Sequence, residues 1–209
     1  LSDEQVNERL SGVDAIIVPG GFGARGMEGM IKASKSARAL KTPFFGIGLG
    51  MQMAVVDIAR HEAGIRDAHT DEIEAPCQDI FYLYGLTEQM KAQLDCLPFG
   101  DLPMRLGAHP MKLEAGSLLE KIYGSEEASE RHHHRREFNP AYSGALAATG
   151  LRYSGMSPDG KLVEAVEWPH HPFFVGTIYH PQFKSRPTRP HPLFIAFLEK
   201  AIAHKKGEK

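Results

Sequence analysis

The sequence has few cysteines, no long hydrophobic run and no excess of charge. Its 209 residues include two cysteines, Cys77 and Cys96, and their spacing fits neither a metal site nor a disulfide framework. No apolar run approaches the length of a membrane span, and no signal peptide is recognisable, so we expect a cytoplasmic protein without a membrane partner. The net charge of −2 gives no reason to expect a nucleic-acid partner. With 42% hydrophobic residues, the chain is long enough for one domain spanning residues 1–209.

The stretch from Pro43 to Gln52 combines a short apolar strand, a glycine-rich turn and the start of a helix. Residues 44–47 predict a buried strand, and apolar residues recur at helical spacing from Met51 onward. A strand-to-helix turn flanked by glycines is typical of a nucleophile elbow, which exposes one side chain beside a helix N-terminus. The residue at the apex is Gly48, which offers no nucleophile.

Four segments of the chain read, in order, VPGGFGARG (18–26), GIGLGMQ (46–52), ERHHHRREFN (130–139) and HPQFKSRP (180–187). They resemble the class I glutamine amidotransferases, and most closely the glutaminase domain of CTP synthase. The resemblance implies an α/β, flavodoxin-like fold with a mainly parallel sheet, flanking helices and a small antiparallel ribbon. Such domains open with a strand and a long helix that do not precede Leu1 here, so we expect the sheet to lack a strand.

The resemblance also implies site residues. In the family a cysteine, a histidine and a glutamate hydrolyse glutamine, and this sequence has Gly48, His180 and Gln182 at those positions. The family positions that bind glutamine and the oxyanion correspond here to Gly20, Gly21, Phe22, Leu49, Gln52, Glu72 and Arg135. Among them, Glu72 matches the residue that receives the amino group of glutamine, and Arg135 matches the residue that binds its carboxylate. Two positions of this wall differ from the family, because His133 and Arg136 stand where it has Arg and Tyr. Arg25 and Gly26 fall in a segment linked to GTP activation, although a solvated loop charge explains Arg25 equally well.

Three histidines, His132 to His134, stand next to one another. We reject a metal site there, because adjacent residues of a strand point to opposite faces. A strand before Asn139 predicts instead that His133 and Arg135 share one face.

Three functional classes remain open. The first is a glutaminase that supplies ammonia for CTP formation from UTP, with Gly48 standing for a modified or mutated cysteine. The second is a catalytically silent module that still binds glutamine or another amino acid, and the third is a structural or regulatory partner. Because both Gly48 and Gln182 depart from the triad, we favour a silent domain.

The resemblance implies no cofactor in this domain, since ATP, magnesium and GTP act on the family's full-length enzyme. The implied partners are glutamine and a synthetase domain, in the same chain or another, and a homo-oligomer is an open alternative.

The remaining elements follow from periodicity and turn signals. We expect helices at 3–11, 28–40, 117–123, 140–148 and 192–203, and a helical turn at 87–94. We expect strands at 15–18, 81–84, 151–155, 161–167 and 173–179, and a further strand that begins at residue 104. The last helix carries an apolar face of Leu193, Phe194, Phe197, Leu198, Ala201 and Ile202.

Overall fold

The computed structural model describes residues 1–73, 77–85 and 102–207. Its helices are α1 (Asp3–Leu10), α2 (Met27–Leu40), α3 (Leu49–His61), α5 (Leu118–Tyr123), α6 (Ser143–Ala148) and α7 (Pro192–Lys205), and its 3-10 turns are η3 (Pro140–Tyr142) and η4 (Pro181–Phe183). Its strands are β1 (Ile16–Val18), β2 (Phe44–Ile47), β3 (Ala68–Thr70), β4 (Gln78–Leu83), β5 (Arg105–Leu113), β6 (Glu127–His134), β7 (Arg136–Phe138), β8 (Arg152–Met156), β9 (Val163–Glu167) and β10 (Phe174–Thr177).

These elements confirm the helices and strands expected from the sequence, with ends that differ by a few residues. The helical turn expected at 87–94, and Cys96, lie outside the described residues. Within the described ranges, no helix is both long enough and apolar enough to cross a membrane.

The large sheet is mixed. Its seven strands lie in the order β1-β2-β10-β9-β8-β5-β6. β1, β2 and β10 are parallel neighbours, whereas every pairing from β10 to β6 is antiparallel. The expected α/β fold is confirmed, but the sheet is not mainly parallel. The cause lies in the connections, because a tight turn at 157–160 joins β8 to β9, and so short a link joins only antiparallel strands.

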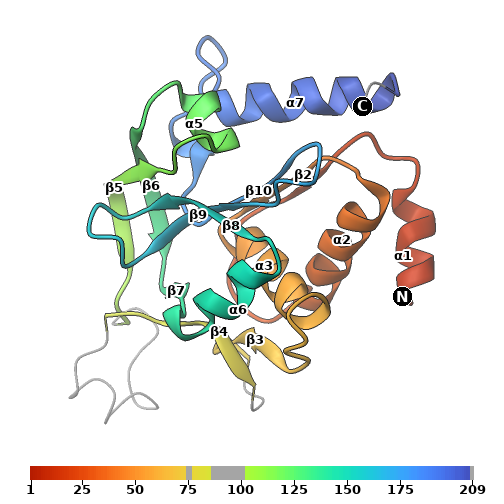
Figure 1. Cartoon of the computed structure of the whole chain (residues 1–209), viewed down its shortest axis with the longest axis horizontal. Coiled ribbons are helices and arrows are strands. Elements are labelled where there is room, and N and C mark those ends of the chain that lie inside the picture. Colours follow the sequence, from red (N-terminus) through yellow and green to blue (C-terminus); the bar gives the residue numbers. More distant parts are fainter. Residues whose placement is uncertain (74–76, 86–101, 208–209) are drawn as a thin grey trace.

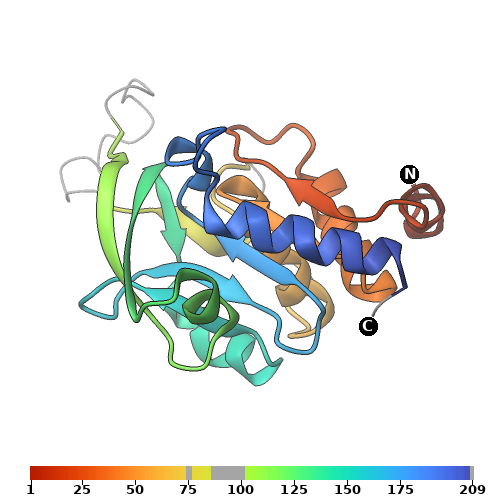
Figure 2. The ribbon, with the colours of Figure 1, turned by 90° about the horizontal axis from the view of Figure 1, so that it is seen from above.

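Helices cover both faces of the large sheet (Figures 1 and 2). α7 and α5 lie on one face, and α2 and α3 lie on the other. Neighbouring residues of β2 serve the two faces alternately, since Phe44 belongs to the core beneath α2 and α3 and Phe45 to the core beneath α7. Phe44 stacks on Phe174 of β10 at a ring separation of 4.6 Å. The parallel strands β2 and β10 are therefore buried on both faces, whereas Ile17 of β1 at the sheet edge is 47% exposed.

The apolar face predicted for α7 is partly wrong. Leu193 and Phe197 are buried, but Leu198 and Ile202 are 58% and 55% exposed. At about 100° per residue, these two side chains lie about 140° and 180° around the helix from Leu193. They face away from the sheet for that reason.

The chain changes sheets at Arg135. β6 pairs with β5 in the large sheet, whereas β7 pairs with β4 in a small sheet of order β3-β4-β7. Arg135 occupies the bend between the two strands. The regular alternation expected for one continuous strand is therefore interrupted, and side chains of consecutive residues turn toward the same space.

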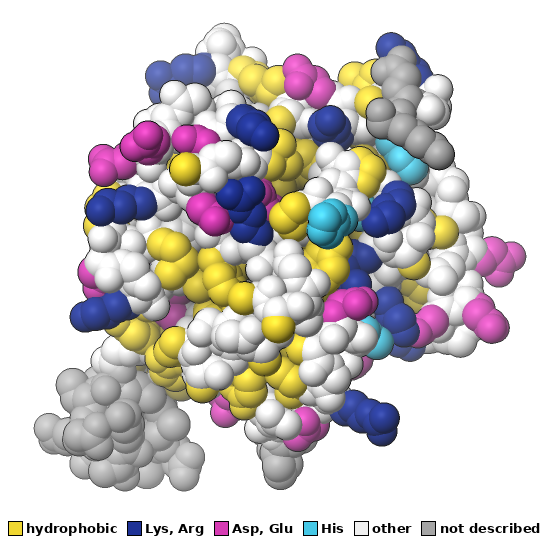
Figure 3. All heavy atoms as spheres, in the orientation of Figure 1, with side chains coloured by type: hydrophobic (Ala, Val, Ile, Leu, Met, Phe, Trp, Pro, Cys, Tyr) yellow, Lys and Arg dark blue, Asp and Glu magenta, His cyan; other side chains and the backbone are white. Residues whose placement is uncertain are grey.

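Charged side chains are spread over the surface. Figure 3 shows acidic and basic side chains interspersed on one face, without a large block of one sign. This distribution agrees with the small net charge of the sequence.

Candidate active site

Gly48 forms the apex of the turn from β2 to α3. Its backbone has φ +54° and ψ −113°, in a region that glycine adopts more readily than other residues. The Gly48 N–H donates to the Thr177 carbonyl of β10 at 2.7 Å, which anchors the turn to the sheet. A Cβ at this position would lie 3.2 Å from Cε1 and 3.3 Å from Nε2 of His180. A side chain at residue 48 would thus begin directly beside an imidazole.

Two neighbouring glycines let the helix approach the sheet closely. A Cβ on Gly50 would lie 2.0 Å from the Val18 carbonyl oxygen, and a Cβ on Gly46 would lie 2.7 Å from the Gly50 carbonyl oxygen. Both neighbours are backbone atoms, so neither can move aside easily. The elbow is therefore built on close contacts that only glycine permits.

The glycine loop after β1 lies across the space above Gly48. A Cβ on Gly20 would lie 2.7 Å from Cε1 of His180, and one on Gly21 would lie 3.7 Å from Cδ2 of Leu49. Leu49 is the first residue of α3, so its N–H has no acceptor within the helix. The glycine loop therefore lies close to both His180 and the start of α3.

His180 contacts Gln182. The Gln182 Nε2 lies 2.8 Å from the His180 Nδ1. Because an amide nitrogen only donates, Nδ1 accepts and the ring proton sits on Nε2, the nitrogen that faces Gly48. This assignment follows from the amide orientation, and the reverse orientation would give the other tautomer. A carboxylate at 182 would permit only the tautomer that leaves Nε2 free to take a proton.

Burial keeps His180 uncharged at neutral pH. The side chain is 8% exposed, and burial, with smaller contributions from His134 and His133, lowers its pKa to about 4. The imidazole stacks on Phe183 with ring centres 5.1 Å apart. Its Nε2 faces the apex of the elbow, where Gly48 offers no nucleophile.

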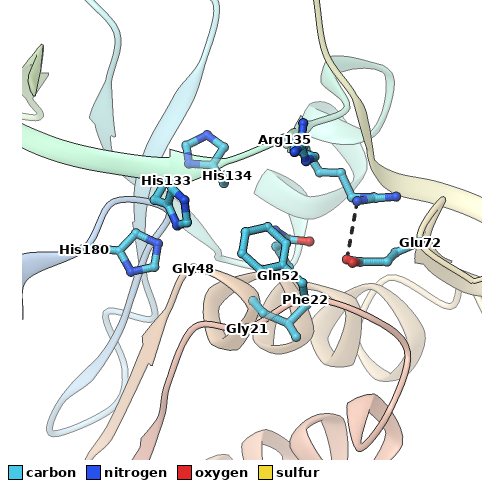
Figure 4. Close-up of a pocket in the computed structure, with 11 residues that line it drawn as sticks. Gly21, Phe22, Gly48, Gln52, Glu72, His133, His134, Arg135 and His180 are labelled. Atoms are coloured by element: carbon cyan, nitrogen blue, oxygen red, sulfur yellow. Dashed lines mark ion pairs between the residues drawn. The ribbon is translucent and has the colours of Figure 1, made fainter. Parts of the chain in front are cut away.

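A pocket connects this centre to the small sheet. The space between its walls, open solvent included, is about 330 Å³, and its lining comprises Gly21, Phe22, Gly48, Leu49, Gln52, Glu72, His133, His134, Arg135, Arg136 and His180. Figure 4 shows His180 and His133 at one end and Glu72 at the other, with Gln52 and Phe22 between them. Of the positions implied by the resemblance, Gly20 and Gln182 lie behind this lining, against His180.

Gln52 lies in the middle of the pocket. It comes from the first turn of α3, is 5% exposed, and its Oε1 has no hydrogen-bond partner among the described residues. A buried amide oxygen without a donor is unfavourable in the empty protein. The pocket thus contains an acceptor that a ligand N–H would satisfy.

Glu72 is engaged by the protein itself. Its Oε1 accepts from the Gly23 N–H at 2.6 Å, and its Oε2 lies 3.6 Å from the Arg136 Nη1 (dashed line in Figure 4). The Arg136 Nε also donates to Asp71. The sequence has Arg136 where the family has a tyrosine, but no pattern in it predicted the ion pairs of Arg136 with Glu72 and Asp71. The spacing gave no signal, because Asp71 and Arg136 are 65 positions apart and meet only through the small sheet.

Arg135 lines the pocket from the bend between β6 and β7. Its Nη1 donates to the carbonyls of Leu102 and Pro103, so this nitrogen is committed to the chain. His133 and Arg135 both reach the pocket, as the sequence predicted, but so do His134 and Arg136. The change of sheets at Arg135 explains why all four do so.

The first and third histidines of the triplet belong to a buried polar network. His134 Nε2 lies 2.7 Å from Glu137, and Arg105 bonds both Glu137 and Glu164. Burial, followed by the charge of Arg105, lowers the pKa of His132 to about 2. Among the residues that the structure describes, no group of histidine, cysteine and acidic side chains is arranged to hold a metal ion.

An elbow, a glycine loop and a histidine on the neighbouring strand end together define a class of protein. The model of the class I glutamine amidotransferase family matches residues 2–200. The chain belongs to this family.

Within the family, the chain is similar to CTP synthases. The chain is 47% identical to the CTP synthase of Syntrophus aciditrophicus, over 99% of this chain and 37% of that protein. It is 45% identical to that of Nitratidesulfovibrio vulgaris, over 100% of this chain and 40% of that protein. The solved glutaminase domain of Trypanosoma brucei CTPS, with bound acivicin, is 34% identical with a TM-score of 0.84, covering 95% of this chain and 75% of that one.

Two further comparisons concern length and fold. The chain spans about two fifths of the length of the CTP synthases it matches. A solved structure from Thermoplasma acidophilum, assigned to a component of GMP synthase, matches with a TM-score of 0.59 at 12% identity, over 100% of this chain and 82% of that one. This second likeness shows the shared fold alone.

Proposed function

We propose that this chain is a CTP synthase-type glutaminase domain that binds a small ligand but does not hydrolyse glutamine. The observation that carries the proposal is Gly48. Gly48 stands at the apex of the elbow, which is the place of the nucleophile in such a site. A Cβ added there would lie 3.3 Å from the His180 Nε2. Glycine forms no thioester, and no other side chain among the described residues that line the pocket is a thiol or hydroxyl.

Gln182 supports the same conclusion independently. Its amide contacts His180 where the family has a carboxylate, and it brings no charge to stabilise an imidazolium. In the serine-protease template, the comparable carboxylate-to-amide change lowers turnover about ten-thousand-fold. Two of the three groups needed for hydrolysis are therefore missing.

The retained pocket favours a binding module over a purely structural part. Gln52, Glu72 and Arg135 all line it, and Gln52 keeps an unsatisfied acceptor. We propose glutamine-like compounds as ligands and a synthetase domain, in the same chain or another, as the partner. ATP, magnesium and GTP would act on that larger assembly rather than in this pocket.

An assay of glutamate release from glutamine tests the proposal. The protein is expected to give no signal above a Gly48→Ala variant, which adds a Cβ without a nucleophile. Turnover of the order of 1 per second or more, absent from Gly48→Ala, would overturn the proposal. An intact mass larger than the printed sequence would point to the alternative of a modified cysteine.

A further inference from the structure

The charged end of the pocket carries information about its ligand. Among the described residues that line the pocket, Glu72 is the one acidic side chain, and Arg135 and Arg136 are both basic. Arg136 also bonds Asp71, so this end of the pocket holds two guanidinium groups and two carboxylates. Burial keeps His180 neutral, so this ring adds no charge to the pocket.

The Glu72 carboxylate is the natural site for a ligand cation, but Arg136 already occupies its neighbourhood. The Arg136 Nη1 lies 3.6 Å from the Glu72 Oε2, and the Gly23 N–H donates to the Glu72 Oε1. The Arg136 side chain is 10% exposed and is held in place by its bond to Asp71. A positive group brought to Glu72 would meet the guanidinium at short range in a poorly solvated place.

We infer that the pocket selects a small carboxylate ligand without a positively charged amino group, and that Arg136 is the residue that sets this specificity. The inference rests on the proposed function, because it concerns the ligand of the same pocket. The ligand's own N–H donor is expected to meet the Gln52 Oε1, which is buried and has no hydrogen-bond partner within the described part of the chain. A carboxylate that carries a carboxamide fits both demands.

Two compounds that differ only in the amino group test the inference by calorimetry. They are L-glutamine and 4-carbamoylbutanoate, which is glutamine without its α-amino group. The protein is expected to bind 4-carbamoylbutanoate at least tenfold more tightly. Arg136→Gln should remove or reverse this preference, because it frees the Glu72 carboxylate for an ammonium group.

Matched variants separate the charge from other effects. Arg136→Lys retains the charge and should retain the preference, and Arg152→Gln removes a guanidinium from β8, outside the pocket lining, and should change nothing. If Arg136→Gln fails to fold, Glu72→Gln serves instead, and it should strengthen the preference for 4-carbamoylbutanoate. Thermal melts of all variants show which are folded.

The outcomes are distinct. Equal or tighter binding of L-glutamine by the unaltered protein would overturn the inference, and so would a preference that survives Arg136→Gln. Binding of neither compound would also overturn it. Glutamate release is measured in the same samples, so a failure of catalytic silence is seen separately from a failure of the ligand preference.

Discussion

The two ends of the pocket differ from a glutamine-hydrolysing site in opposite ways. At the Gly48 end a group is absent, since the elbow and His180 are in place but no nucleophile stands between them. At the Glu72 end a group is added, since Arg136 pairs with the carboxylate that the resemblance assigns to the ligand's amino group. The backbone is intact at both ends. A fold can therefore preserve the backbone of a site while changed side chains alter which ligands it binds and which reaction steps it catalyses.

The largest effect should come from supplying the missing groups at the Gly48 end. Gly48→Cys combined with Gln182→Glu should give measurable glutamate release, about a thousandfold or more above Gly48→Cys alone. The thiol supplies the nucleophile, and the carboxylate fixes the His180 tautomer that can accept its proton. Gln182→Glu alone should remain inactive. A double variant that binds glutamine but stays inactive would contradict the view that only these two groups are missing.

Substitutions at Gly48 and Gly50 should lower the free energy of unfolding by different amounts. Gly50→Ala should cost about 4 kcal/mol or more, or prevent folding, because its Cβ would lie 2.0 Å from the Val18 carbonyl oxygen. Gly48→Ala should cost about 1–3 kcal/mol, because the added Cβ meets positive φ and a movable imidazole at 3.2 Å. Urea unfolding measures both. A Gly48→Ala protein more stable than its parent would show that residue 48 is not a strained elbow.

A smaller effect is expected at the Glu72 end. In the Gly48→Cys, Gln182→Glu background, adding Arg136→Gln should lower KM for glutamine about tenfold and leave kcat within about threefold. The change removes a repulsion felt equally by bound substrate and transition state. Steady-state kinetics measure this, with Arg136→Lys as the control that should keep the high KM. A fall in kcat with constant KM would instead place Arg136 near the reacting atoms.

A further effect concerns pH. The pKa of His180 is about 4 in the folded protein against about 6.5 when unfolded, so the unfolded state binds more protons between these values. The contribution of His180 to stability is therefore present above pH 6.5 and is lost as pH falls toward 4. His180→Asn should flatten the fall in unfolding free energy over this window by at most about 1.4 kcal/mol per pH unit. His170→Asn, at an exposed site, serves as the control. If both variants flatten the pH dependence of the unfolding free energy equally, His180 is not its cause.

Local signals in the sequence predicted the elbow end of the pocket well. The run from Phe44 to Ile47 and the glycines around residue 48 specify a strand and a turn within a few residues of one another. The placement of His180 followed from its motif. The Glu72 end was not predictable in this way, because the Arg136 pair depends on the chain passing from one sheet to another at Arg135.

The most direct test of the central claim is the mass of the protein after treatment with an electrophilic glutamine analogue. The account predicts that the untreated protein has the mass of the printed sequence, with glycine at residue 48, and gains no adduct. Gly48→Cys should gain a single adduct under the same conditions, on the new thiol. An adduct on the unaltered protein that maps to the peptide containing residues 44–61 would contradict the account.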